Sequence, residues 1–227
     1  MARLSRRVAR PLALAALFGA LAPAQQPPQV AGLPPLEALP PLVCPDPPEG
    51  GRDADRAPEE RERRRAYRAL LPLFLAALPE ARDTELLMPV FGARVAHVAD
   101  TWGAPRGGGR VHEGQDIFAP EGTPVYSATY GFVYRIGEND LGGNVVTVIG
   151  GAGVRYYYAH LSAFAEGLTE GQAVTPETLL GFVGRTGNAS GTPPHLHLGM
   201  YTGLCDWEAE DPLPLLVDRD WQAGLDD

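Results

Sequence analysis

Two of the five histidines in this chain of 227 residues stand on either side of one leucine, in the stretch PPHLHLG at residues 193–199. In an extended strand, residues two apart leave the same face, about 6.6 Å apart along the strand. The side chains of His195 and His197 are therefore expected to be neighbours that face either water or a polar cavity. Imidazole binds zinc and moves protons near neutral pH, so the pair predicts one of these two kinds of chemistry.

Two more histidines and an aspartate that could bind a metal or move protons lie earlier in the sequence. RVHEGQDIFAP places His112 and Asp116 four residues apart, and RYYYAHLS carries His160. A catalytic zinc site uses three protein ligands and keeps one position open for water. His112, Asp116 and one of the pair His195 and His197 supply such a set, and spacing alone does not choose between these two. The remaining histidines could move protons or donate hydrogen bonds to a developing oxyanion.

The elements that must position these residues are predicted to be short strands. After Met88, β-rich runs alternate with glycine, and no helix of normal length fits between Gly107 and Met200. EGTPVYSATYGFV at 121–133 and EGQAVTPETLLGFV at 170–183 share E-G-x-x-V followed by G-F-V. We interpret this repeat as an internal duplication and predict a mainly β sandwich or barrel, in which each copy closes the open side of the other. Chance recurrence of glycine and valine is the alternative.

The three motifs, in this order, resemble those of the lysostaphin-type (LytM-like) zinc endopeptidases of peptidoglycan, over about residues 88–213. In that family an H-x-x-x-D motif and an H-x-H motif frame the site. Here they stand as HEGQD at 112–116 and HLH at 195–197, with AHL at 159–161 between them and GTPV after the first. The resemblance implies that His112, Asp116 and His197 bind one zinc ion per chain, and that His160 and His195 act in catalysis. It also implies a duplicated hybrid-motif β-sandwich or barrel.

The activity that the resemblance implies is hydrolysis of peptide bonds in peptidoglycan stem peptides or crosslinks, by metal-activated water assisted by two histidines that are not ligands. Two other classes of function are the alternatives. A non-catalytic wall-binding or amidase-activating module could share the fold, and a phosphocarrier-like β sandwich could use paired histidines. Retention of all five polar site residues favours the enzyme, and Asp116 has no role in a phosphocarrier.

The chain departs from the family at two places. The loop before the first motif reads PRGGGR, where some relatives carry a tyrosine; its Arg106 and Arg110 could bind a carboxylate of the stem peptide, or simply be solvated. Gly199 stands where many relatives have a glutamate that could support the ligands. Tyr156 to Tyr158 are expected to alternate between core and cleft, and His97 is expected to be structural or on the surface.

The first 24 residues have the pattern of an export signal. Four arginines precede the apolar stretch from Pro11 to Ala22, and Ala22-Pro23-Ala24 supplies a cleavage site. Twelve apolar residues are too few to span a bilayer. We therefore expect a cleaved, exported protein in the periplasm or outside the cell, with no stable membrane span; an uncleaved anchor is the alternative.

The net charge limits the classes of ligand that the protein can bind, and the two cysteines raise the question of a disulfide. The net charge is −9, and removal of the four arginines in the first 24 residues would make it −13. A nucleic acid is therefore excluded as the main ligand, while peptidoglycan is the partner that the resemblance implies. In an oxidising compartment, Cys44 and Cys205 could form a disulfide. A thiol nucleophile is the alternative, but nothing in the sequence lowers the pKa of Cys205 visibly.

The composition divides the chain into five parts. Residues 1–24 form the signal peptide, 25–50 a proline-rich linker, 51–80 a helical segment, 86–217 the zinc endopeptidase domain and 218–227 a C-terminal tail. Within the helical segment, a helix is predicted at 58–71, and Pro72 should end or kink it. We expect this N-terminal helical extension to cover one edge of the catalytic domain.

Overall fold

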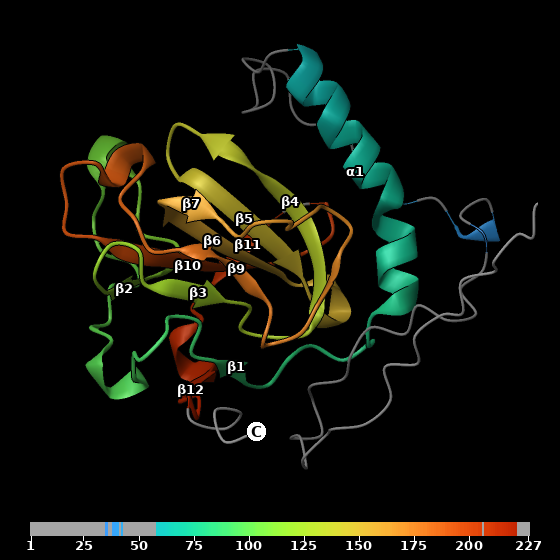
Figure 1. The fold of residues 1–227 in the computed structure, drawn as a ribbon. Coiled ribbons are helices and arrows are strands. Elements are labelled where there is room, and N and C mark those ends of the chain that lie inside the picture. Colours follow the sequence, from blue (N-terminus) through green and yellow to red (C-terminus); the bar gives the residue numbers. More distant parts are fainter. Residues whose placement is uncertain (1–34, 36–37, 41, 43–57, 206, 222–227) are drawn as a thin grey trace, which may run out of the picture.

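The computed structural model describes residues 58–205 and 207–221, together with residues 35, 38–40 and 42. The predicted signal peptide lies outside the described residues, as do most of the predicted linker and the end of the predicted tail. The described chain is mainly β with one α-helix, as the sequence predicts (Figure 1). Within this part of the chain, no helix is both long enough and apolar enough to cross a membrane.

The helix is α1 (Pro58–Ala77). The strands are β1 (Leu86–Leu87), β2 (Gln115–Phe118), β3 (Pro124–Tyr126), β4 (Gly131–Asn139), β5 (Gly143–Ile149), β6 (Arg155–Leu161), β7 (Ala163–Phe164), β8 (Ala173–Val174), β9 (Leu179–Phe182), β10 (His195–Thr202), β11 (Glu208–Glu210) and β12 (Leu216–Val217). Between Gly107 and Met200 the helical segments are 3-10 turns of three residues, so the prediction that no normal helix fits there is confirmed.

The largest sheet has the strand order β11-β10-β6-β5-β4-β8, and β2 also pairs with β10. Strand β10 therefore lies between β6 on one edge and β2 with β11 on the other. Leu196 and Leu198 of β10 are fully buried in the main core, together with Tyr156 and Tyr158 of β6. Because side chains alternate along a strand, His195 and His197 face the opposite side of the sheet.

The two copies of the sequence repeat pair with each other in equivalent registers. The pairs are Val125 with Gly181 and Pro124 with Phe182 between β3 and β9, and Gly131 with Val174 and Phe132 with Ala173 between β4 and β8. Corresponding amides also donate to corresponding carbonyls, from Gly122 to Val183 at 2.8 Å and from Gly171 to Val133 at 2.7 Å. This reciprocal pairing holds the small sheet (β3-β9-β7) to the large one; a duplicated hybrid motif as its origin stays a prediction.

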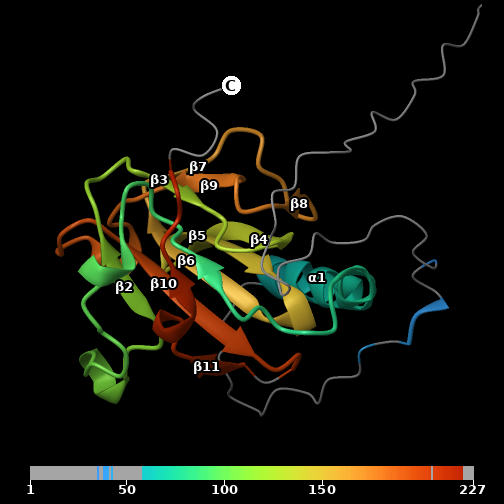
Figure 2. The ribbon, with the colours of Figure 1, turned by 90° about the horizontal axis from the view of Figure 1, so that it is seen from below.

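Helix α1 continues through Pro72 to Ala77, so the prediction that it ends at residue 71 is wrong. A proline inside a helix removes one hydrogen bond and costs about 3 kcal/mol. Leu71 and Phe74, however, are buried against Phe132 and Tyr134 of β4. Burial of each large apolar side chain contributes about 1.5–3 kcal/mol, which offsets the loss at Pro72. The helix covers the β4 and β5 end of the large sheet, away from β2 (Figures 1 and 2).

The ends of the β region meet in a short parallel pair, in which Leu86 of β1 lies beside Leu216 of β12. These strands begin and end at the bounds predicted for the endopeptidase domain, residues 86 and 217. The first residues of the predicted tail pack onto this domain. The guanidinium of Arg219 donates to the backbone carbonyls of Met88, Ser127 and Pro176, and it lies over the ring of Trp221.

Candidate metal centre

Strands β2 and β10 bring the predicted ligands together. His197 is the direct partner of Asp116 across this antiparallel pair, and His112 lies three residues before β2 begins. Nε2 of His112 lies 2.8 Å from Nδ1 of His197 and 3.0 Å from Oδ1 of Asp116. Nδ1 of His197 lies 3.1 Å from the same carboxylate oxygen. Among the described residues, these three form the one group of histidine, cysteine and acidic side chains that could hold a metal ion.

The donor atoms fit a small divalent cation. Three ligand atoms at 2.0–2.1 Å from a tetrahedral zinc ion lie about 3.3 Å from one another. The three atoms here are 2.8–3.1 Å apart, so an opening of a few tenths of an ångström would admit the ion. Nδ1 of His112 faces the carbonyl of Thr101 at 2.8 Å, so it carries the proton and leaves the lone pair of Nε2 for the ion. Two imidazole nitrogens and a carboxylate oxygen are a ligand set that zinc accepts.

Burial and neighbouring charges shift the pKa values of two of these ligands, Asp116 and His197. Burial alone would raise the pKa of the Asp116 carboxyl, but its contacts with His112, His197 and the Arg106 guanidinium outweigh burial and hold that pKa well below its usual range. Burial lowers the pKa of His197, and the neighbouring Asp116 opposes this only in part. At neutral pH Asp116 is therefore a carboxylate and His197 a neutral imidazole, the forms that bind a metal.

The remaining two site histidines share one arrangement. Nδ1 of His160 lies 2.9 Å from the carbonyl of Thr186, and Nδ1 of His195 lies 2.8 Å from the carbonyl of Pro193. Because a carbonyl only accepts, each Nδ1 carries the proton and each Nε2 is free to act. The two ring centroids are 4.9 Å apart, and Nε2 of His195 lies 3.7 Å from Oδ1 of Asp116. Burial, with the nearby His197 and His195, lowers the pKa of His160 to about 4, so this ring is neutral at pH 7.

The backbone of His160 is strained. Its φ of 63° lies in the left-handed region, which residues other than glycine seldom adopt, and its amide donates to the carbonyl of Gly142 at 2.7 Å. Such strain costs about 1–3 kcal/mol and is concentrated at functional sites. Gly142 must itself lack a side chain, because a Cβ there would lie 2.0 Å from the hydroxyl of Tyr157. The β4 to β5 turn therefore helps to hold the His160 backbone in place.

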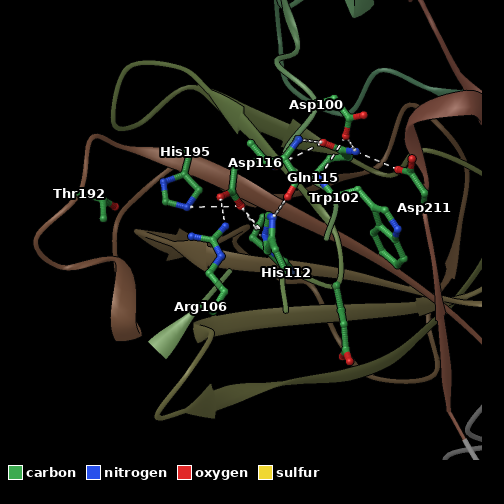
Figure 3. A network of polar contacts seen from close by, with 12 residues as sticks. Asp100, Trp102, Arg106, His112, Gln115, Asp116, Thr192, His195 and Asp211 are labelled. Carbon is green, nitrogen blue, oxygen red and sulfur yellow. Dashed lines mark hydrogen bonds and ion pairs between the residues drawn. The ribbon is translucent and has the colours of Figure 1, made fainter. Parts of the chain in front are cut away.

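The two arginines predicted to bind substrate differ in their contacts. The guanidinium of Arg106 donates to Oδ2 of Asp116 at 2.6 Å and leaves Oδ1 to the two imidazoles (Figure 3). Arg110 is exposed, and its Nε donates to the carbonyl of Gly107 in the same loop. The structure thus gives Arg106 a partner within the site, while binding of a substrate carboxylate by either arginine stays a prediction.

The structure also shows where the tyrosines of β6, Gly199 and His97 lie. Tyr156 and Tyr158 are buried in the core, whereas the ring of Tyr157 faces that of His197 at 6.1 Å, as the expected alternation requires. Gly199 makes room for Tyr201, since a Cβ at this glycine would lie 2.8 Å from that ring. His97 is exposed in a 3-10 turn outside the cluster.

Cys205 is disulfide-bonded, which removes it as a free thiol nucleophile. Cys44, the other cysteine of the sequence, lies outside the described residues.

The sequence patterns did not identify two residues that support the site, Thr101 and Gln115. Thr101 accepts a hydrogen bond from His112, and Gln115 in turn accepts one from the amide of Thr101 at 2.9 Å. Gln115 had one available signal, since it is a polar residue at a core-facing position of the strand QDIF. Thr101 lies in a loop eleven residues before His112 in the sequence, and no periodic pattern points to it.

A β domain that brings two imidazoles and one carboxylate together is an arrangement that metal-dependent hydrolases use. Residues 110–212 match the model of Peptidase family M23.

Among similar proteins, the L-Ala--D-Glu endopeptidase of Bacillus subtilis (strain 168) is 44% identical over 131 residues, which are 54% of this chain and 39% of the relative. Lysostaphin of Staphylococcus simulans is 36% identical over 111 residues, which are 48% of this chain and 22% of the relative. The solved catalytic domain of lysostaphin from Staphylococcus simulans is 29% identical, with a TM-score of 0.45, and covers 53% of this chain and 92% of that one. The chain thus spans less than half the length of these two curated relatives.

Proposed function

We propose that this protein is an exported, zinc-dependent endopeptidase that hydrolyses peptide bonds in the stem peptides or crosslinks of peptidoglycan. The observation that carries the proposal is the cluster of His112, Asp116 and His197, with the imidazoles of His160 and His195 beside it. The match of residues 110–212 to Peptidase family M23, and the similarity to an L-Ala--D-Glu endopeptidase and to lysostaphin, support it. Export to the periplasm or cell exterior rests on the signal-like pattern of residues 1–24.

His112, Asp116 and His197 would hold one zinc ion per chain through Nε2, Oδ1 and Nδ1. When bound there, zinc lowers the pKa of water toward about 7 and polarises a peptide carbonyl. His160 and His195 each present the lone pair of Nε2, so either can accept a proton from the attacking water. Once protonated, the same nitrogen becomes a donor that can stabilise an oxyanion or protonate the departing amine.

Two alanine variants on one strand test the ligand assignment. His197→Ala removes a ligand and should abolish stoichiometric zinc binding by the purified protein, measured by elemental analysis. His195→Ala is the matched control, since the same residue type is lost two positions away; it should keep zinc and lose turnover. Equal zinc content in His197→Ala and the unaltered protein would refute the ligand set.

Purified sacculi test the reaction. The unaltered protein should release soluble muropeptides, and mass spectrometry of these products would identify the bond that is cut. A protein that binds sacculi but releases nothing would instead be a non-catalytic wall-binding module, and the proposed hydrolysis would be wrong.

A further inference from the structure

Gln115 is a buried carboxamide on the core-facing side of strand β2. Its neighbour Asp116 faces the metal centre, and its partner across the sheet is Leu198, which is fully buried. The side chain of Gln115 is itself completely buried. An apolar residue would be the ordinary choice here, because a buried amide costs free energy unless its polar atoms find partners.

All four hydrogen-bonding positions of this amide are used. Oε1 accepts from the backbone amide of Thr101 at 2.9 Å and from its hydroxyl at 3.2 Å. Nε2 donates to the carboxylates of Asp100 and Asp211, both at 2.9 Å. Since a carboxamide has two N–H groups and two lone pairs, Gln115 is fully satisfied and can hold one orientation. It ties three segments together: the loop at 100–102, strand β2 and the turn at 211–213 (Figure 3).

The loop that Gln115 holds touches two of the three candidate ligands. The carbonyl of Thr101 accepts from Nδ1 of His112 at 2.8 Å, which fixes the tautomer that leaves Nε2 unprotonated. The hydroxyl of Thr101 accepts from the backbone amide of Asp116 at 3.0 Å. One residue outside the HEGQD motif therefore orients one ligand ring and anchors the backbone of another ligand.

We propose that Gln115 is a positioning residue for the metal centre, acting through Thr101 on His112 and Asp116. This inference rests on the proposed function, because it concerns how the zinc ligands are oriented. The core-facing amide fixes the loop, the loop carbonyl fixes the His112 tautomer, and the loop hydroxyl fixes the strand at Asp116. Gln115 touches neither the ion nor the substrate.

Gln115→Met tests the proposal, because methionine keeps an unbranched side chain of similar size and removes all four hydrogen bonds. Zinc affinity should fall about 10- to 100-fold, measured by competition with a chromophoric chelator at pH 7. The visible absorption spectrum of the Co²⁺-loaded protein should also change, because the ligand rings would be less well oriented. Thr101→Val should weaken zinc binding in the same direction, whereas Thr101→Ser keeps the hydroxyl and should bind zinc within about twofold of the unaltered protein.

Asp83→Asn is the matched control, because Asp83 is also a buried polar side chain that makes several hydrogen bonds, but it lies outside the metal centre. Asp83 accepts hydrogen bonds from Thr129 and Tyr156 at 2.7 Å each, so its replacement should lower the melting temperature without changing zinc affinity or the Co²⁺ spectrum.

Zinc affinity and a Co²⁺ spectrum unchanged in both Gln115→Met and Thr101→Val would overturn the positioning role, while the proposed function would stand. If Gln115→Met does not fold, the pair of Thr101 variants decides in the same way. An unaltered protein that takes up no zinc would overturn the proposed function and this inference together.

Discussion

Replacing Gly114 with alanine should displace the His197 imidazole. A Cβ at Gly114 would lie 2.6 Å from Cε1 and 2.8 Å from Nε2 of that ring, and 2.6 Å from the carbonyl oxygen of Leu198. Ordinary van der Waals contact begins at 3.4 Å, so the ring must move by about 0.8 Å, the difference from 2.6 Å, and the backbone at Leu198 or Gly114 must shift as well. Strand β10 is paired on both edges at His197, so the ring is the more mobile of the two.

Metal sites tolerate deviations of about 0.2 Å in ligand distance, and the expected displacement is about four times larger. Changes in the partners of ligands alone weaken metal binding about 10- to 100-fold, so Gly114→Ala should weaken zinc binding about 100-fold or more. The extra methyl should also lower the free energy of unfolding by about 1–3 kcal/mol.

Competition with a chelator measures the zinc affinity, and urea unfolding measures the free energy of unfolding. Gly191→Ala is the control, because a Cβ there meets no atom within 4 Å. Zinc affinity in Gly114→Ala equal to that of the control would show that the His197 ring does not lie against Gly114.

Three further predictions concern charge and packing. Burial raises the pKa of Asp83 above 3.8, despite hydrogen bonds from Tyr156 and Thr129. Between pH 3.8 and the higher pKa of the folded state, the folded protein therefore binds more protons than the unfolded protein. The free energy of unfolding that Asp83 contributes is therefore lost as the pH rises through this range. The stability deficit of Asp83→Asn should therefore shrink with rising pH in thermal unfolding scans; a deficit independent of pH would contradict the shift. Arg106→Gln removes a donor that lowers the pKa of Asp116, so that pKa should rise in the zinc-free protein, followed by NMR titration of the carboxyl carbon; an unchanged value would show that the contact does not persist in solution. Phe74→Ala should cost about 3 kcal/mol by urea unfolding, because its buried ring lies 5.0 Å from that of Phe132, and an effect below 1 kcal/mol would mean that α1 is not docked on β4.

The H-x-x-x-D and H-x-H motifs were predictable as a site because β pairing turns sequence spacing into proximity. Alternation along β10 puts His195 and His197 on one face, and antiparallel register puts Asp116 opposite His197. Sequence spacing left open which histidine completes the ligand set, since both rings leave the same face. The structure separates them: Nδ1 of His197 lies 3.1 Å from Oδ1 of Asp116, whereas Nε2 of His195 lies 3.7 Å from it.

The features that the sequence did not predict depend on contacts between distant segments. Thr101 contacts His112 through its carbonyl and Asp116 through its hydroxyl, but it lies in a loop where no periodic pattern points to it. Because its loop is rich in glycine, Arg106 was expected to be solvated or to bind the substrate. Instead, its guanidinium donates to the buried carboxylate of Asp116, ten residues further along the chain. The end of α1 was misplaced because local propensity at Pro72 is outweighed by apolar burial, which only the folded sheet provides.

The position of α1 bears on whether the N-terminal extension blocks the site or supports it. Phe74 packs on Phe132 and Tyr134 of β4, and the guanidinium of Arg155 lies between Tyr134 and Trp207. From Trp207, ring contacts continue through Tyr201 and Tyr157 to His197. The helix and the metal centre therefore lie at opposite ends of one continuously packed face of the sheet. Since the helix buries the β4 and β5 end of that face, we expect it to support the sheet that carries the ligands rather than to block the site.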